Sequence, residues 1–535
     1  MTNQKKLYEE FLEEQIKIIP SLNDSLNIKK FEYLRNRMEN PYSDYQEKIE
    51  LSFFKDFLIK VNKIPISKQN IYDKFLKHIC ECAVDETKYN FNLIPISPLE
   101  NDIAYMAENA AGNGTFMFET KKCYDIFLEK MKMFPEICFS VIVRMRQGIQ
   151  KNYTLPKRAA EKLLEQFKQL EKTKSYYNPQ ATKNYNKKIE QMFKPEIERI
   201  IQFLQSEYIP ACRKTIGWSE LPNGKAEYEF LVKNTITQSN VSIKSIHEFG
   251  LLEVERIRVQ MENIMSQMEF KGSRKDFFAY IRKRKDLQYK DKNEVIKLYR
   301  DMYNHIEKTI MPRLFSDKIK TKCEILAVPK YNEKYSPEAY YIEGDDDGKR
   351  PGRFYLNLRN ISHNSKIEIE SLTLHETLPG HHYQLSLVNE RKNLPEFVKI
   401  YGVESYLEGW GLYCENLGEY ETAESYFGKL VLEMIRALRL VVDTGIHYYG
   451  WSYDKCFKYF KKYGFETDDQ IHTQLIRYIC IPTQALAYKM GEKCIIECLQ
   501  KYHKDGGNDI KEFHKIVLED GAIPLYLLRE KFGLK

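Results

Sequence analysis

Three of the eleven histidines in the sequence fall within one short segment, Leu374-His375-Glu376-Thr377-Leu378-Pro379-Gly380-His381-His382. His375 and Glu376 form the front half of the zinc peptidase motif H-E-x-x-H. In that motif two histidines one helical turn apart bind zinc, and the glutamate activates a water molecule. The position one turn after His375 is Pro379, which has no ligand atom. The segment therefore predicts a zinc site with Glu376 as general base. Its second histidine ligand must lie at a position other than 379.

A regular helix cannot bring His375 and His382 to one ion, because seven residues rise about 10 Å along the axis and Zn–N bonds are about 2.0–2.1 Å. Pro379 cannot donate a helical hydrogen bond, and Gly380 tolerates unusual backbone angles. Together they allow the helix to bulge by two residues, which places His381 where the second ligand belongs. We expect His381 as ligand and His382 in contact with a ligand or the substrate. The alternative is a helix that ends at Pro-Gly with incidental histidines.

A third ligand is expected from the segment YLEGWGLYCENL, in which Glu404, Glu408 and Glu415 lie near one helical face. Gly409 and Gly411 flank Trp410 there, and glycine is costly inside a helix unless something approaches closely. We therefore predict Glu408 as a metal ligand, with Glu404 or Glu415 hydrogen-bonded to a histidine. The alternative is a glutamate-rich face exposed to solvent.

The elements that must position these residues are mostly helices. Apolar residues recur three and four apart through most of the chain, and glycine and proline are scarce (24 and 19 of 535 residues). Short β-branched and aromatic stretches at 320–329, 339–344 and 352–358 predict three strands, the last two joined by a turn at Asp345–Pro351. The sequence predicts a mainly α fold with a small three-stranded β-sheet. We expect the strand at 352–358 to line the cleft and to pair with an extended peptide, as edge strands do.

The polar stretch at 173–187 lacks helical periodicity, so it is the best candidate for a loop between lobes. It divides an N-terminal helical lobe, 1–185, from a lobe with the metal site, 186–535, unless the two form one continuous domain. A helix is expected to begin at Pro195, since proline favours the first turn.

Composition excludes several classes of function. The net charge of +7 is the difference between 83 basic and 76 acidic residues, so nucleic acid is not an expected partner. Eleven cysteines without a C-x-x-C pair indicate reduced thiols. The N-terminus does not resemble a signal peptide, and charged residues interrupt the most apolar long segment, which contains Glu433, Arg436, Arg439 and Asp443. We expect a cytoplasmic protein without membrane contact, and the oligomeric state stays open.

The segments HETLPGHHYQ, LEGWGLYCENLG, VDTGIHYYGW and RYICIPTQALAYKMG resemble the C-terminal signature of the domain-of-unknown-function 885 family. That family is a largely helical, zincin-like group similar to the thermostable carboxypeptidase and oligopeptidase gluzincins. The resemblance extends upstream through MRQGIQKNYTLP, AEYEFLVKNTIT and GRFYLNL, and so covers most of the chain. It implies a metal-dependent peptidase-like site, with His375, His381 and Glu408 around the metal and Glu376 beside it. It does not imply a substrate.

Further roles fall on residues in the segments that match the family. An oxyanion formed during hydrolysis needs a donor, for which His447 and Tyr488 are candidates, and each has a structural role in the core as the alternative. Arg477 is a candidate for binding a substrate carboxylate bidentately. Its alternative is an internal ion pair with Asp443.

The sequence thus predicts a hydrolase of peptide or other amide bonds, carboxypeptidase-like or oligopeptidase-like, with one zinc ion per chain. The competing hypothesis is a helical binding or scaffold protein that keeps the fold and has lost catalysis. The intact His375-Glu376 pair argues against that loss.

Overall fold

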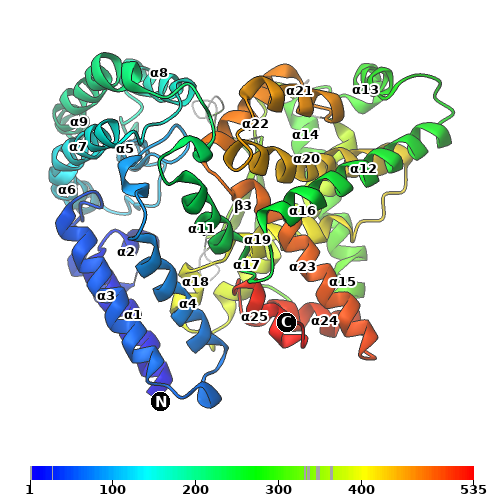
Figure 1. The fold of residues 1–535 in the computed structure, drawn as a ribbon, viewed down its shortest axis with the longest axis horizontal. Coiled ribbons are helices and arrows are strands. Elements are labelled where there is room, and N and C mark those ends of the chain that lie inside the picture. Colours follow the sequence, from blue (N-terminus) through cyan, green and yellow to red (C-terminus); the bar gives the residue numbers. More distant parts are fainter. Residues whose placement is uncertain (1–2, 27, 330–332, 334–337, 345–349, 362–364) are drawn as a thin grey trace. The chain divides into compact units, whose positions relative to one another are not determined.

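A computed structural model describes residues 3–26, 28–329, 333, 338–344, 350–361 and 365–535 (Figure 1). The described chain is mostly helical and contains a three-stranded sheet, which confirms the expected fold class. It divides into two compact units. Unit 1 comprises Met1–Phe230, Ile446–Tyr453 and Thr473–Pro482, and unit 2 comprises Leu231–Gly445, Asp454–His472 and Thr483–Lys535.

Unit 1 is built from helices packed on one another. They are α1 (Asn3–Ile18), α2 (Leu22–Leu26), α3 (Asp44–Asn62), α4 (Ile71–Glu86), α5 (Asp102–Ala110), α6 (Lys121–Lys130), α7 (Phe134–Lys151), α8 (Lys157–Thr173), α9 (Lys183–Phe203), α10 (Ile209–Ala211) and most of α11 (Gly224–Ile236). The unit extends beyond residue 185, where the polar stretch suggested a boundary. The reason is that α9 packs against α7, with the rings of Phe193 and Phe134 stacked 3.9 Å apart.

Helix α9 begins at Lys183, twelve residues before the start expected at Pro195. One buried apolar face runs along α9 through Tyr185, Ile189, Phe193 and Ile197, so it continues across the proline. Burial of this face outweighs the hydrogen bond that proline removes from a helix interior. The stretch after α8 is therefore a loop within unit 1.

Unit 2 combines the remaining helices with the sheet. The helices are α12 (Ile243–Gln267), α13 (Arg274–Lys283), α14 (Lys292–Thr309), α15 (Met311–Leu314), α16 (Ile369–Glu376), α17 (His381–Glu390), α18 (Glu396–Ile400), α19 (Glu404–Glu415), α20 (Ala423–His447), α21 (Tyr453–Tyr463), α22 (Asp468–Cys480), α23 (Gln484–Lys504), α24 (Ile510–Leu518) and α25 (Leu525–Lys531). The end of α20, the first residue of α21 and the larger, C-terminal part of α22 belong to unit 1. Within the described residues, no helix is long and apolar enough to cross a membrane.

The sheet contains β1 (Cys323–Ala327), β2 (Ala339–Ile342) and β3 (Gly352–Leu356) in the order β1-β3-β2. β3 pairs parallel with β1 and antiparallel with β2. It is therefore the central strand, and the expectation that it offers an edge to an extended peptide is wrong, because both of its edges are already paired. The turn expected at Asp345–Pro351 lies largely outside the described residues.

One face of the sheet holds the helices that carry the histidines. Ile325, Phe354 and Leu356 form a buried cluster with α14 and with Ile369, at the start of α16. Tyr341 of β2 lies on the same face, since it pairs with Phe354, and its hydroxyl reaches α17. The sheet and α14 thereby fix α16 and α17 on both sides of the break between them.

Candidate metal centre

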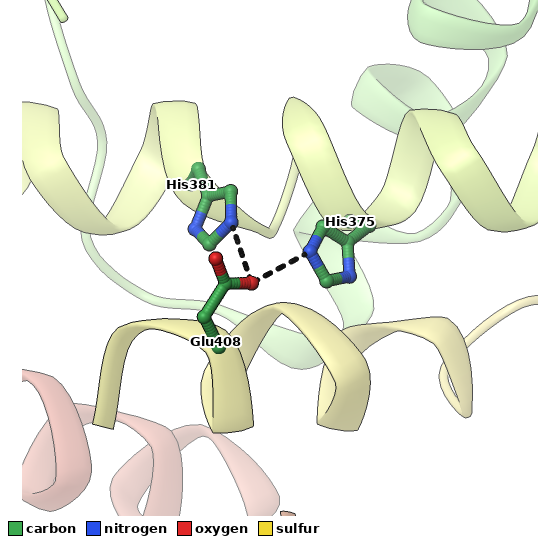
Figure 2. A group of neighbouring side chains, drawn as sticks. All are labelled: His375, His381 and Glu408. Carbon is green, nitrogen blue, oxygen red and sulfur yellow. Dashed lines mark hydrogen bonds and ion pairs between the residues drawn. The ribbon is translucent and has the colours of Figure 1, made fainter. Parts of the chain in front are cut away.

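His375, His381 and Glu408 converge at one point in unit 2, although they come from three different helices (Figure 2). His375 lies near the end of α16, His381 is the first residue of α17, and Glu408 lies in the middle of α19. Glu408 Oε2 lies 3.3 Å from His375 Nε2 and 3.5 Å from His381 Nε2. The three ligand-type atoms lie within 4.8 Å of one another.

This arrangement fits a zinc ion. Two atoms that each lie about 2.0–2.2 Å from a tetrahedral zinc are about 3.3–3.5 Å apart, which agrees with the two distances to Glu408. Two imidazole nitrogens and one carboxylate oxygen are a donor set that zinc accepts, and they leave the fourth position for water or substrate. The geometry thus brings together the three residues that the sequence predicts as ligands.

The break between α16 and α17 explains how His381 comes to face His375. The N–H of Tyr383 donates to the carbonyl oxygen of Thr377, six residues earlier, where a regular helix would use the residue four earlier. The two additional residues form the bulge expected from Pro379-Gly380, although the helix also ends at Glu376 and begins again at His381. A Cβ atom at Gly380 would lie 1.8 Å from the carbonyl oxygen of His375, so the close approach requires glycine.

The four consecutive residues Glu408-Gly409-Trp410-Gly411 each contribute to the site. A Cβ atom on Gly411 would lie 2.7 Å from Cε1 of His375, so this glycine makes room for the imidazole. Gly409 lets α23 approach, since its Cβ atom would lie 2.4 Å from the backbone of Gly491. The indole Nε1 of Trp410 donates to the carbonyl oxygen of Pro379 at 2.9 Å and holds the break in place. The costly glycines of this segment therefore have a steric reason.

Glu415 orients His375 from the side of the ring that faces away from Glu408. Its Oε1 lies 2.8 Å from His375 Nδ1, and its Oε2 accepts a hydrogen bond from Ser371 at 2.7 Å. Because a carboxylate only accepts, Nδ1 of His375 carries a proton, so Nε2 is the nitrogen that would bind a metal. Of the two glutamates considered for this role, the structure selects Glu415. Glu404 is half-buried at the start of α19.

The charges of the cluster interact strongly. Burial disfavours a charged His375, but hydrogen bonds to Glu408 and Glu415 outweigh burial and raise its pKa to about 9. Burial likewise opposes ionisation of Glu408, yet hydrogen bonds to His375 and His381 hold its pKa well below the usual range. A carboxylate held ionised between two imidazoles is a suitable environment for a cation.

Glu376 lies beside the cluster and is only 8% exposed. Burial raises its pKa, and the charges of His375 and His381 offset this only in part. A raised pKa favours a carboxylate that takes up a proton readily. The raised pKa of Glu376 is consistent with the predicted general base, and that role stays a prediction.

His382 does not join the cluster. It is completely buried, and its Nδ1 forms a hydrogen bond of 2.9 Å with the hydroxyl of Tyr341. Burial lowers its pKa to about 4. His381 faces the cluster, whereas His382 faces the sheet and anchors α17. His382 therefore does not lie where we expected it, in contact with a metal ligand or with the substrate.

His447 also has a place in the core, within unit 1. Its Nδ1 accepts from the backbone N–H of Trp218 at 3.3 Å, and its Nε2 lies 2.8 Å from the carbonyl oxygen of Tyr478. Burial lowers its pKa to about 3. Both ring nitrogens are bound to backbone, so the structure favours the alternative of a core histidine over the oxyanion donor.

The structure treats the other two candidates differently. Tyr488 of α23 lies in unit 2, and its ring is roughly parallel to that of His375 with centroids 6.3 Å apart. It thus borders the candidate centre, and its role as oxyanion donor stays a prediction. Arg477 is half-buried in the part of α22 that belongs to unit 1, and its role as carboxylate ligand also stays a prediction.

Sequence reasoning missed Ser371 and Arg436. Arg436 lies in α20 with its Nη2 atom 3.6 Å from Glu415 Oε1. Its signal in the sequence is a charged residue in an otherwise apolar helix, which must meet a polar environment if the helix is buried. Ser371 precedes His375 by one turn and offers no comparable signal.

The chain belongs to a family of bacterial proteins of unknown function, DUF885, whose model matches residues 25–532. This confirms the family suggested by the signature segments. No curated protein is similar enough in sequence to match.

Two solved structures share the fold, and each is described as a "putative lipoprotein". The protein from Colwellia psychrerythraea has a TM-score of 0.89 and 22% identity, with 99% of this chain and 98% of that chain covered. The protein from Shewanella oneidensis, of unknown function, has a TM-score of 0.75 and 15% identity, with 98% of each chain covered. At these identities the likeness shows the fold alone. The cytoplasmic location expected from the sequence stays a prediction.

Proposed function

We propose that this protein is a zinc-dependent hydrolase of peptide or other amide bonds. The observation that carries the proposal is the convergence of His375, His381 and Glu408, with the buried carboxylate of Glu376 beside them. Two imidazoles, one carboxylate and a neighbouring glutamate are the components from which zinc peptidases are built.

In the proposed reaction, His375, His381 and Glu408 hold the metal. Bound zinc polarises the substrate carbonyl and lowers the pKa of water. Glu376 takes a proton from the attacking water and passes it to the leaving amine, so that the nitrogen departs as a neutral group. Glu415 and Ser371 keep the ring of His375 in its orientation. Tyr488, whose ring lies 6.3 Å from that of His375, would donate to the developing oxyanion.

The catalytically silent scaffold remains the competing function. A scaffold needs packing but has no need of a buried ionisable residue next to three convergent ligands. Burial of an ionisable carboxyl such as that of Glu376 costs stability. The retention of that residue supports catalysis over a purely structural site.

The test combines metal analysis with the variant Glu376→Gln. Purified wild-type protein should contain about one zinc ion per chain. Glu376→Gln should keep that metal and the fold, because glutamine has the same shape, yet lose at least about 10²–10⁴-fold in turnover because it cannot carry a proton. Hydrolysis of a peptide pool by both proteins, followed by mass spectrometry, measures the difference.

Two results would contradict the proposal. If metal-replete wild-type protein cleaves no peptide, with either blocked or free ends, the scaffold hypothesis gains. If cleavage survives Glu376→Gln, the chemistry takes place at another site.

A further inference from the structure

Arg436 of α20 is a buried guanidinium with few partners. It is 8% exposed, and its one hydrogen bond to a described residue goes from Nη1 to the carbonyl oxygen of Leu432 at 3.2 Å. Its Nη2 lies 3.6 Å from Glu415, which is too long for a hydrogen bond. Its Nε is buried and has no partner among the described residues. Since a guanidinium carries five N–H donors and buried donors are normally satisfied, Arg436 can bind a further partner.

The donors without a hydrogen bond lie on one edge of the group. Nε and Nη2 form the fork that binds the two oxygens of a carboxylate. Glu415 does not fill this fork, because its Oε1 lies 3.6 Å from Nη2, which is too far for a hydrogen bond. The fork therefore matches a second carboxylate that the chain itself does not supply among its described residues.

Arg436 lies next to the candidate metal centre. Glu415 lies between the two, since its Oε1 is 3.6 Å from Arg436 and 2.8 Å from the predicted ligand His375. Its guanidinium carbon also lies 5.8 Å from the ring centre of Tyr488, and that of Arg439, one turn further along α20, lies 4.5 Å from the same ring. The ring of Tyr488 in turn lies against His375. Two buried positive charges thus flank the aromatic ring that borders the centre.

We propose that Arg436 binds a free carboxylate of the substrate, with Arg439 adding positive potential beside it. The inference rests on the proposed function and names its substrate class: peptides or N-acyl amino acids whose scissile amide is next to a terminal carboxylate. In such substrates the carboxylate carbon is three bonds from the carbonyl carbon under attack, so the two groups must bind at neighbouring subsites. The role expected of Arg477 thereby falls to Arg436.

The experiment compares a pair of blocked dipeptides that differ only in a free or an amidated C-terminus. Wild-type protein should prefer the free acid. Arg436→Met should raise KM for the free acid by about 10- to 100-fold, the loss expected for a hydrogen-bonded charge pair, and should therefore abolish most of the preference for the free acid over the amide. Arg436→Lys keeps a positive charge near Glu415 but lacks the fork, so it should keep its metal content and recover the preference only in part.

Arg144→Met is the matched control. Arg144 is also buried, but its guanidinium binds Asp44, Glu47 and the carbonyl oxygen of Tyr42 in unit 1. This variant removes a buried arginine of similar exposure and should keep the preference for the free acid. Zinc content and Tm of every variant separate loss of binding from loss of fold.

Each outcome decides between the inference and the proposed function. If wild-type protein cleaves both dipeptides equally well, or if Arg436→Met lowers kcat for both and leaves KM unchanged, the inference is overturned and the hydrolase stands. If the protein cleaves neither, calorimetric titration with N-acetylphenylalanine and with its amide decides. Binding of the acid that Arg436→Met abolishes would support the subsite without the hydrolase, and absence of binding would overturn both.

Discussion

At the scale of single residues, identical side chains have opposite roles according to where the backbone points them. His381 and His382 are adjacent, yet the first faces Glu408 at 3.5 Å and the second is bonded to Tyr341. The break before α17 sets this register, because two additional residues return His381 to the face of His375. A shift of one residue would exchange the two roles.

This pair gives a sharp prediction. His381→Ala should lose bound zinc, since it removes one of three ligands. His382→Ala should keep most of it and instead lower Tm, because it leaves a cavity and removes the hydrogen bond to the Tyr341 hydroxyl. Zinc per chain, measured by elemental analysis after dialysis, and thermal unfolding of both variants test this. Zinc loss in His382→Ala with retention in His381→Ala would show that the register is shifted by one.

Residue types made part of the site predictable. The His-Glu pair, the Pro-Gly step and Glu408 beside two glycines each carry a local chemical or steric reason. Arg436 could not be found in this way, because its importance depends on α20 packing next to Glu415. Nor could the sequence alone decide whether His447 donates to substrate or binds to backbone, since an imidazole ring is capable of either role.

At the scale of elements, α19 is shaped by what must approach it. Its glycines admit the ring of His375 on one face and the backbone of α23 on another. Trp410 between them holds Pro379. Each glycine lowers the stability of the helix by about 1 kcal/mol relative to alanine, and the close packing of His375 and α23 requires it.

Gly411→Ala tests that account. On propensity alone it should stabilise α19, but the new Cβ atom would lie 2.7 Å from the ring of His375. We expect the ring to shift, zinc affinity to fall by at least about tenfold, as when the partner of a ligand is lost, and Tm of the metal-free protein to change little. Competition with a chelator measures the affinity.

Gly402→Ala is the control, because it lies just before α19 and the closest contact of its Cβ atom would be the end of the Leu407 side chain, at 3.1 Å. Its zinc affinity should equal that of the wild type. Equal affinity in Gly411→Ala would mean that the ring has room to spare and that Gly411 is there for another reason.

Helices and strands could be predicted where the pattern of apolar residues and the bounding glycine and proline residues agree, as for the three strands. They were less so where tertiary contacts override a local signal. Pro195 suggests a helix start, but the buried face of α9 continues through it. Strand pairing depends on partners distant in sequence, so nothing local to 352–358 indicated that β3 would be central.

At the scale of the whole molecule, the candidate centre lies entirely within unit 2. α16, α17 and α19 carry the ligands, and α20 and α23 bring Arg436 and Tyr488 beside them. The 186–535 lobe expected for the metal contains all of these residues, together with parts of the chain that belong to unit 1. Unit 2 also buries His382 and His514 as neutral rings, which links its stability to pH.

The last prediction concerns this linkage. Burial lowers the pKa of His514 to about 4, whereas an unfolded imidazole has a pKa of about 6.5. Below about pH 6.5 the unfolded state therefore binds a proton that the native state does not, so stability falls as pH decreases towards 4. Between pH 6.5 and 4.5 this residue alone should cost on the order of 2 kcal/mol.

His514→Gln removes the titrating group, and glutamine can still accept from Tyr413 and donate to the carbonyl oxygen of Leu314, as His514 does. At pH 7 the variant should be no more stable than the wild type, because it loses the ring stacked on Phe315. As pH falls, the wild type should lose stability faster, and the difference in Tm should shrink. Thermal unfolding in the presence of a chelator keeps metal release out of the comparison. Parallel curves down to pH 4.5 would mean that His514 does not carry the linkage.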